Sequence, residues 1–350
     1  MPISYPLAGV SLQNILVRAT NWVGDAVMCL PALRALRLQH PNSRITVLAR
    51  PWVADLYRRE PFADEVILLH AARGPRDLRG KWAAAQSLRG HRFDCAVLLQ
   101  NAFEAALIAW LARIPIRTGY NRDGRRLLLT HPIDLPPSGR HERFYYLELL
   151  TRAGLIPATP QDDVVRLECA PLARAAGLQR FQQLGLAAPV IGVSPGAAYG
   201  TAKRWIPENF AQAAITLARN LSAQVALFGS PGEAQLCQSI ADAISAAGIG
   251  VRSFAGQTAL NDYIDLAAAC HVYLTNDSGA MHISSALGVP TVAIFGATDH
   301  IGTGPAGHRF SIVRHDVDCS PCLLRECPID HRCMTLVTPD QVVAAALKLL

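Results

Sequence analysis

Short apolar runs alternate with longer amphipathic stretches along the whole chain. Runs rich in valine, isoleucine and leucine predict β-strands, and the amphipathic stretches predict helices. The expected strands are Asn14–Arg18, Ile45–Ala49, Val66–Leu69, Cys95–Leu99, Val190–Ser194, Gln224–Phe228, Val272–Thr275 and Thr291–Phe295. The expected helices are Asp25–Gln39, Arg76–Leu88, Asn101–Ala112, His141–Ala153, Leu172–Leu184, Glu208–Arg219, Glu233–Ala247, Leu260–Ala269, Gly279–Leu287 and Pro339–Leu350. Because buried strands between helices are typical of a parallel sheet covered on both faces, the pattern predicts an α/β fold.

The alternation pauses once, in the proline-rich segment 157–189. It then resumes, so that two βαβ series of similar length follow each other. A length of 350 residues agrees with this division, because domains commonly hold about 150 residues. We therefore expect two domains, residues 1–170 and residues 171–350.

Composition narrows the class of protein. Hydrophobic residues make up 51% of the chain and charged residues 17%, which excludes an intrinsically disordered chain. No apolar run approaches the ~20 residues of a membrane-spanning helix, and residues 1–12 lack the pattern of a secretory leader. Nine cysteines are an odd number in a chain too long for a disulfide scaffold, which indicates a reducing, cytoplasmic compartment.

Candidate chemistry lies in the turns after the expected strands, because parallel α/β sheets bind ligands at the carboxyl ends of their strands. The first turn runs from Arg18 to Asp25, and Gly24 permits a tight backbone at the helix start. Two interpretations of Asp25 stay open. Its carboxylate either stabilises the amino end of the helix or acts as a general base toward an acceptor hydroxyl.

The turn after the strand 190–194 combines pliable backbone with positive charge. Gly196 and Gly200 make it pliable, and Lys203 and Arg204 place cationic donors at its end. This combination suits an oxyanion or a diphosphate, although a solvated basic turn has the same composition. The chain has neither a Walker loop nor a Gly-x-Gly-x-x-Gly fingerprint, which argues against a dinucleotide enzyme.

Two further turns carry groups that suit a ligand. In the turn 228–233, Glu233 either accepts hydrogen bonds from sugar hydroxyls or begins the next helix. In the turn 275–282, Ser278 and Gly279 open a helix whose free amides suit phosphate oxygens. His282 lies on nearly the same helical face and adds a side-chain donor. Asp277 is expected to orient the turn or a ligand hydroxyl, because a carboxylate repels phosphate.

Positive charge is moderate overall and concentrated in one stretch. The net charge is +6. Several arginines fall within residues 113–126, namely Arg113, Arg117, Arg122, Arg125 and Arg126. They form either a solvated loop or a groove for a phosphorylated or carboxylated substrate. No nucleic-acid-binding module is recognisable, so we expect no nucleic-acid partner.

Three of these motifs occur together in a known order. Asn-Trp-Val-Gly-Asp, Pro-Gly-Ala followed by Ala-Lys-Arg-Trp, and Thr-Asn-Asp-Ser-Gly-x-x-His resemble those of the family-nine glycosyltransferases, the lipopolysaccharide heptosyltransferases, most closely type II. The resemblance implies a GT-B fold, with an acceptor domain and an ADP-sugar domain, both Rossmann-like, facing each other across a cleft. It also implies an inverting transfer of L-glycero-D-manno-heptose from ADP-heptose to the inner-core heptose-Kdo-lipid A of lipopolysaccharide.

The resemblance implies roles for individual residues. Asp25 would activate the acceptor hydroxyl, Lys203 would offset charge on the leaving diphosphate, and Glu233 would hold the donor ribose. The other implied donor-binding residues are Gly196, Thr201, Asp277, Ser278, Gly279 and His282. Ala198 and Tyr199 stand where some family members carry hydroxyl residues, so Thr201 or backbone amides would take over that contact.

Partners and cofactors follow from the same resemblance. Arg117, Arg122 and Arg125 would bind the anionic Kdo–lipid A acceptor, with the enzyme in peripheral contact with the cytoplasmic face of the inner membrane. No Asp-x-Asp pair of the metal-dependent type is evident, so we expect transfer without a metal. Three alternatives stay open: another GT-B sugar-nucleotide transferase or epimerase, a non-catalytic nucleotide-sugar binding protein, and a metal or redox module built on the cysteines.

The segment 319–333 holds four cysteines in the spacing C-x2-C-x4-C-x5-C, namely Cys319, Cys322, Cys327 and Cys333. Four thiolates suit a tetrahedral zinc, although the usual structural site pairs two C-x2-C units. Free thiols or disulfides are the alternative. We interpret the segment as a clip on the donor domain, with a structural zinc as a hypothesis, rather than as the catalytic centre.

Overall fold

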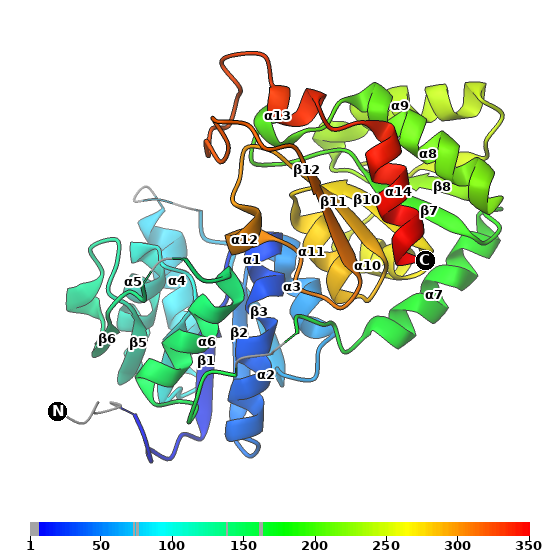
Figure 1. The fold of residues 1–350 in the computed structure, drawn as a ribbon. Coiled ribbons are helices and arrows are strands. Elements are labelled where there is room, and N and C mark those ends of the chain that lie inside the picture. Colours follow the sequence, from blue (N-terminus) through cyan, green and yellow to red (C-terminus); the bar gives the residue numbers. More distant parts are fainter. Residues whose placement is uncertain (1–6, 73, 75–76, 138, 161–163) are drawn as a thin grey trace. The chain divides into compact units, whose positions relative to one another are not determined.

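The computed structural model describes residues 7–72, 74, 77–137, 139–160 and 164–350. Residues 1–6, for which no secretory leader is expected, and Arg76, the expected start of a helix, lie outside the described residues. The chain folds as two compact units, Met1–Asp163 and Val164–Leu350 (Figure 1). Among the described residues, no helix combines the length and the apolar character needed to cross a membrane.

The first unit is built on a six-stranded parallel sheet in the order β3-β2-β1-β4-β5-β6. Its strands are β1 (Asn14–Arg18), β2 (Arg44–Ala49), β3 (Glu65–Leu68), β4 (Cys95–Leu98), β5 (Ile116–Tyr120) and β6 (His131–Ile133). Its helices are α1 (Val23–Met28), α2 (Leu30–Gln39), α3 (Pro51–Arg58), α4 (Leu78–Arg89), α5 (Phe103–Leu111) and α6 (Glu142–Ala153). Helix α1 contacts α2, α3 and α6, and α4 packs on α5, so that two helical layers cover the sheet (Figure 1).

The second unit repeats this plan with a sheet in the order β12-β11-β10-β7-β8-β9. Its strands are β7 (Val190–Ser194), β8 (Gln224–Leu227), β9 (Val251–Ser253), β10 (Val272–Asn276), β11 (Thr291–Phe295) and β12 (Phe310–Arg314). Its helices are α7 (Ala170–Gln183), α8 (Pro207–Leu221), α9 (Ala234–Ala246), α10 (Leu260–Ala268), α11 (Gly279–Ala286), α12 (His300–Thr303), α13 (Arg332–Thr335) and α14 (Pro339–Leu349). Helix α8 contacts α9 and α14, whereas α10 contacts α7 and α11 (Figure 1).

Both sheets have the same strand order, since counting each unit from its own first strand gives 3-2-1-4-5-6 twice. This is the Rossmann order, in which all strands are parallel and the order of successive strands across the sheet reverses between the first and the fourth strand, a point that we call the strand reversal. The reversal falls between β1 and β4 in the first unit and between β7 and β10 in the second. Ligands of such sheets bind at the carboxyl edge beside this reversal. The predicted Rossmann-like architecture is therefore confirmed, and each unit has one preferred ligand edge.

The second unit begins at Val164, earlier than the expected boundary at residues 170/171. The backbone amides of Val165 and Leu167 donate to carbonyls of Ala306 and Ala286, which ties the connecting segment to the second unit. Helix α7 also packs tightly on α10, where a Cβ on Gly177 would lie 1.9 Å from the carbonyl oxygen of Asp265. The prolines of segment 157–189 predicted where the two units are connected, but they could not show that the connecting segment packs on the second unit.

Most expected strands and helices are present with small shifts of their ends. The expected helix 25–39 is two helices that meet at Cys29, because Pro31 in the first turn of α2 has no amide to continue the earlier hydrogen bonds. The strands β5, β6, β9 and β12 were not expected. They lie in the outer halves of their sheets, and β5 and β9 carry the charged residues Arg117 and Arg252, so an apolar-run criterion does not find them.

Candidate functional site

Lys203 and Asp277 form the centre of the ligand edge in the second unit. Lys203 ends the short helical turn Thr201–Lys203 after β7, and Asp277 directly follows β10. The Lys203 Nζ lies 2.6 Å from Asp277 Oδ2, with the side chains only 14% and 5% exposed. The Thr298 hydroxyl, from the loop after β11, donates to the same carboxylate oxygen at 2.5 Å. Asp277 therefore orients the lysine ammonium at the strand reversal.

Asn276, the last residue of β10, fixes the loop that carries Lys203. Its side chain is fully buried, and its Nδ2 donates to the Pro195 carbonyl at 2.7 Å. Its Oδ1 accepts from the Trp205 amide at 3.0 Å. The carboxamide thus bonds both ends of the loop 195–205, which we call the donor loop because the sequence predicts that it binds the sugar donor. The indole of Trp205 is buried as well and donates to the Val337 carbonyl at 3.0 Å.

Glu233 lies against the start of the donor loop. A Cβ built on Gly196 would lie 1.9 Å from Glu233 Oε1, so that a larger residue there would displace the Glu233 carboxylate. The other oxygen, Oε2, accepts from the amide and the hydroxyl of Ser230 at 2.8 Å each, in a capping box. In the described chain Oε1 accepts no hydrogen bond. Glu233 therefore takes part in the start of the helical turn, and its Oε1 is placed beside Gly196. Its binding of sugar hydroxyls stays a prediction.

The amino end of α11 completes this edge. Ser278 is the residue before the helix, Gly279 is its first residue, and the first-turn amides have no partner within the helix. His282 lies one turn further and is 6% exposed. The Ser278 hydroxyl shares a hydrogen bond with that of Thr275 at 3.2 Å. Thr201, by contrast, is exposed at the start of its turn. The structure thus brings Gly196, Lys203, Glu233, Asp277 and the start of α11 to one sheet edge.

Asp25 lies at the ligand edge of the first unit, half-buried in the first turn of α1 directly after β1. Its neighbours include two other titratable groups, Cys29 and Tyr146. Burial, with a further contribution from the charge of Asp25, raises the pKa of Cys29 to about 12 and that of Tyr146 well above its ordinary value. Both groups stay protonated at neutral pH, which leaves Asp25 as the candidate base among them.

Of the predicted acceptor arginines, Arg122 and Arg125 lie near each other after β5, whereas Arg117 does not join them. Arg122 is exposed at the carboxyl end of β5, beside Asp123 at 3.5 Å. Arg125 is fully buried, and its guanidinium donates to the carbonyls of Gln100 and Tyr120 and to Asn101 Oδ1. Burial lowers the pKa of Arg125 to about 10, so it keeps its charge at neutral pH and supports the edge from within.

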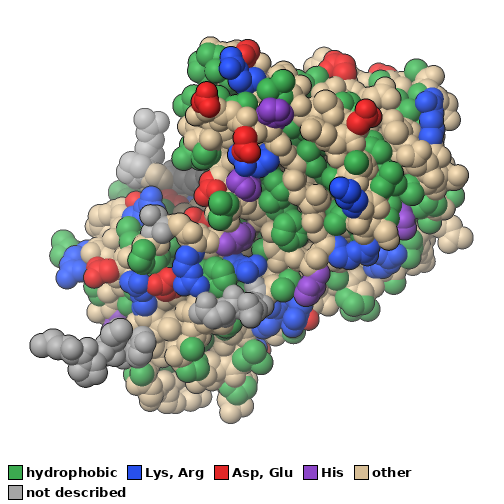
Figure 2. Space-filling model, in the orientation of Figure 1, with side chains coloured by type: hydrophobic (Ala, Val, Ile, Leu, Met, Phe, Trp, Pro, Cys, Tyr) green, Lys and Arg blue, Asp and Glu red, His purple; other side chains and the backbone are tan. Residues whose placement is uncertain are grey.

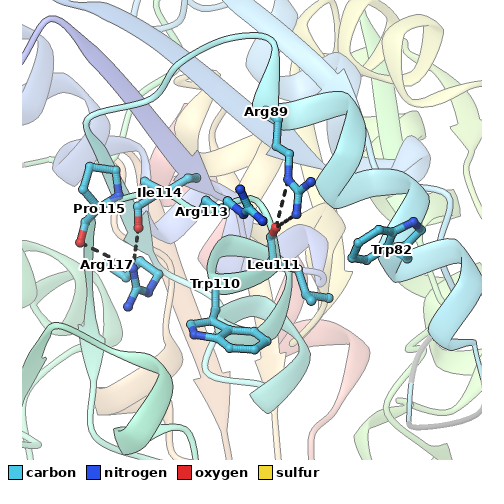
Figure 3. A pocket seen from close by; sticks show the side chains of 8 residues that line it. All are labelled: Trp82, Arg89, Trp110, Leu111, Arg113, Ile114, Pro115 and Arg117. Atoms are coloured by element: carbon cyan, nitrogen blue, oxygen red, sulfur yellow. Dashed lines mark hydrogen bonds between the residues drawn. The ribbon is translucent and has the colours of Figure 1, made fainter.

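Arg117 lies at the opposite, amino end of β5 and belongs to a pocket instead. The pocket holds about 470 Å³ and is lined by Trp82, Arg89, Trp110, Leu111, Arg113, Ile114, Pro115 and Arg117 (Figure 3). Arg89 of α4 donates to the Leu111 carbonyl at 2.8 Å, and Arg117 donates to that of Pro115 at 3.4 Å (Figure 3). On the face shown in Figure 2, basic side chains lie in several separate small groups.

Two residues of the first ligand edge were not predicted from the sequence. Arg18 ends β1 and Arg50 follows β2, and both side chains are buried. Arg18 donates to Asn21 Oδ1 at 2.8 Å, and Arg50 pairs with Glu104 at 3.2 Å. With Arg125, these side chains place positive charge under the carboxyl ends of several strands. An arginine at the end of an apolar strand is the signal that could have revealed them.

The cysteine-rich segment contains free thiols. Cys319 is exposed and Cys333 is buried. Burial, together with the three other cysteines of the segment, raises the pKa of Cys333 to about 11. Among the described residues, no group of three or more His, Cys, Asp or Glu side chains is placed so as to hold a metal ion. The structural zinc therefore stays a hypothesis without a ligand set in the described chain.

An Asp-x-Asp triplet does occur after β12, as Asp316, Val317 and Asp318. The expectation concerned pairs of the metal-dependent type, and it stays a prediction. Both carboxylates are exposed, and Asp316 pairs with Arg314 at 2.5 Å. In the described chain the triplet belongs to no group of metal ligands.

Known proteins resemble the chain over most of its length. Residues 81–332 match the family described as glycosyltransferase family 9 (heptosyltransferase). The lipooligosaccharide heptosyltransferase 2 of Haemophilus influenzae is 33% identical over 315 residues, which cover 86% of this chain and 88% of that protein. The lipopolysaccharide heptosyltransferase 1 of Pseudomonas aeruginosa is 25% identical over 335 residues, which cover 90% and 87%.

A solved structure has the same fold. The ADP-heptose lps heptosyltransferase II of E. coli superposes with a TM-score of 0.83 and 30% identity, over 96% of this chain and 98% of that one. Together with the two sheets of Rossmann order, this similarity confirms the predicted GT-B fold.

Replacing Asn276 tests the connection between β10 and the donor loop. Asn276→Ala leaves the Trp205 amide and the Pro195 carbonyl unpaired in a buried place, so we expect a loss of about 2–4 kcal/mol in the free energy of unfolding. Urea unfolding measures it. Asn220→Ala, at an exposed position of α8, is the matched control and should change stability by less than about 0.5 kcal/mol. Equal effects of the two variants would contradict the assigned role.

Proposed function

The chain belongs to glycosyltransferase family 9, the heptosyltransferases, and on this premise we propose that it transfers L-glycero-D-manno-heptose from ADP-heptose to the inner-core heptose of heptose-Kdo-lipid A. The proposed reaction inverts the anomeric carbon. It is the second heptose addition to the core, because the acceptor already carries one heptose.

The proposed ADP-sugar donor is supported by the side chains and backbone groups at the ligand edge of the second unit. A buried ammonium, a helix amino end and a free carboxylate oxygen lie around one strand reversal. Lys203 and the first-turn amides of α11 suit the two phosphates of a nucleoside diphosphate. Glu233 suits the hydroxyls of its ribose, because its Oε1 accepts no hydrogen bond in the described chain.

The relatives support the second rather than the first heptose addition. The type 2 enzyme of Haemophilus influenzae is 33% identical, whereas the type 1 enzyme of Pseudomonas aeruginosa is 25% identical over a similar share of the chain. The E. coli protein of the solved structure is named as an ADP-heptose enzyme. We propose the same donor for this chain, because the groups at the ligand edge of the second unit fit a diphosphate.

In the proposed mechanism each unit supplies one half of the chemistry. The acceptor hydroxyl oxygen attacks the anomeric carbon while its proton passes to the Asp25 carboxylate. The bond from the anomeric carbon to the diphosphate breaks, and ADP leaves with the electron pair. Lys203, His282 and the amides at the start of α11 offset the charge that develops on the leaving phosphate. Lys203 supplies positive charge where other enzymes use a cation, so transfer is proposed to need no metal.

The proposed lipid acceptor also requires contact with a membrane surface. Trp82 and Trp110 are each 49% exposed beside Arg89, Arg113 and Arg117. In the described chain none of these three arginines pairs with a carboxylate. Half-exposed tryptophans beside arginines that have no carboxylate partner in the described chain suit the interface of an anionic bilayer. We therefore propose this pocket as the place where the enzyme contacts the cytoplasmic leaflet.

A comparison of two acceptors tests the function directly. With ADP-heptose as donor, we expect transfer to heptosyl-Kdo–lipid A and at least about 100-fold less to Kdo–lipid A that lacks the first heptose. Mass spectrometry of the products measures both. The reverse preference would identify a type I enzyme. Binding of ADP without transfer to any acceptor would instead indicate a non-catalytic binding protein.

Replacing Asp25 tests the base. Asp25→Asn keeps the shape and removes the proton acceptor, so kcat should fall about 10²–10⁴-fold while the affinity for ADP changes little. Glu208→Ala is the control, because Glu208 is likewise a carboxylate in the first turn of a helix, α8, but is exposed and has no role in the proposed reaction. If Asp25→Asn lowers only the melting temperature, as a helix-stabilising carboxylate would, the assignment fails.

Charge reversal tests the membrane contact. Arg113→Glu should weaken binding to vesicles of phosphatidylglycerol at least tenfold in a sedimentation assay, because each basic residue near an anionic surface contributes about 1 kcal/mol. Arg219→Glu, on the exposed face of α8 in the second unit, should leave it unchanged. Equal losses in the two variants would indicate an effect of net charge and overturn the proposed surface.

A further inference from the structure

The cysteine-rich segment 319–333 lies directly against the donor loop. Both backbone groups of Ala202, the residue before Lys203, bond to it. The Ala202 amide donates to the Arg325 carbonyl at 3.0 Å, and the His331 ring Nε2 donates to the Ala202 carbonyl at 2.9 Å. The peptide groups that flank Ala202 are therefore held by residues more than a hundred positions away in the sequence.

The contact continues on the other side of the loop. The Tyr199 hydroxyl donates to the Leu323 carbonyl at 2.8 Å. The Tyr199 ring lies 4.9 Å from the Lys203 Nζ and 5.1 Å from the Arg325 guanidinium carbon, measured to the ring centroid. A Cβ on Gly200 would lie 2.1 Å from the Arg325 carbonyl oxygen. The segment thus approaches the donor loop so closely that residue 200 must be glycine.

The same segment is anchored beside the partner of Lys203. The Leu323 amide donates to the Ala297 carbonyl at 2.8 Å, and the Ser320 hydroxyl donates to the Gly296 carbonyl at 2.6 Å. A Cβ on Gly296 would lie 2.9 Å from the Cys333 sulfur. These contacts fix the loop that carries Thr298, whose hydroxyl binds Asp277.

We propose that the segment 319–333 positions the Lys203–Asp277 pair, and that His331 is a positioning residue of the transfer reaction. One side of the segment holds the backbone next to Lys203, and the other side holds the backbone next to Thr298. The segment 319–333 therefore helps to set the distance between the Lys203 ammonium and the Asp277 carboxylate. A lysine held in this way keeps its ammonium at the leaving phosphate without a loss of side-chain freedom during the reaction. The inference rests on the proposed role of Lys203.

The first test changes the hydrogen bond that the His331 side chain donates to the Ala202 carbonyl. His331→Ala removes the donor, and His331→Gln restores an amide N–H of similar reach. We expect His331→Ala to lower kcat/KM for ADP-heptose about tenfold and to weaken ADP binding in calorimetry, and His331→Gln to recover most of both. A purely structural role would lower the melting temperature and leave kcat per folded molecule unchanged, which would overturn the proposal.

A double-mutant cycle separates positioning from every other effect. If His331 acts through Lys203, adding His331→Ala to Lys203→Ala should reduce kcat/KM no further. A full additional tenfold loss in the double variant would overturn the proposal. Should Lys203→Ala itself leave ADP affinity and transfer unchanged, the proposed function fails, whatever the result for His331.

Gly200→Ala tests the contact between the donor loop and Arg325 by a change in the donor loop. The added methyl group must push Arg325 away from the loop, so we expect a loss of kcat/KM at least as large as that of His331→Ala. Gly90→Ala is the control, because a Cβ there meets only the Ser87 carbonyl oxygen, at 3.9 Å. Tyr199→Phe removes one hydrogen bond without steric change and keeps the test open if Gly200→Ala does not fold. An unchanged kcat/KM in Gly200→Ala and Tyr199→Phe would contradict the proposal.

Discussion

The second unit depends on one buried ion pair, between Lys203 and Asp277. Removing two charges from water is costly, and their attraction offsets that cost only if the geometry is good and the other polar atoms are bonded. Both conditions hold, because the ion pair is 2.6 Å long and Thr298 bonds the carboxylate. Loss of either charge would leave the other buried alone, so three loops from β7, β10 and β11 must keep their relative positions.

The two units share a strand order but differ in the chemistry at their strand ends. In the first unit, the guanidiniums of Arg18 and Arg125 donate largely to backbone carbonyls and amide oxygens, and that of Arg50 pairs with Glu104. In the second unit, small residues and one lysine surround the strand reversal. A repeated topology therefore supplies two equivalent edges, and the residues at the strand ends decide what each edge binds.

The repeated strands and most helices could be predicted because burial on both faces produces continuous apolar runs. The strand-end turns could be predicted for the same reason, and the structure gathers Gly196, Lys203, Glu233 and Asp277 at one edge. Three features depended on contacts distant in sequence. Strand β5 has a charged residue, Arg125 is buried despite its basic neighbours, and His331 reaches Ala202 across more than a hundred residues. Spacing along the chain carries no information about such pairs.

The tryptophans are distributed unequally between the units. All five lie in the described chain, and Trp22, Trp52, Trp82 and Trp110 of the first unit are each about half exposed. Trp205 is 1% exposed and is bonded through its backbone amide to Asn276, at the end of the donor loop. An indole in an apolar core emits at shorter wavelength than one in water. The intrinsic fluorescence of this protein therefore contains a blue component from the donor loop and a red component from the other unit, so each half carries its own optical label.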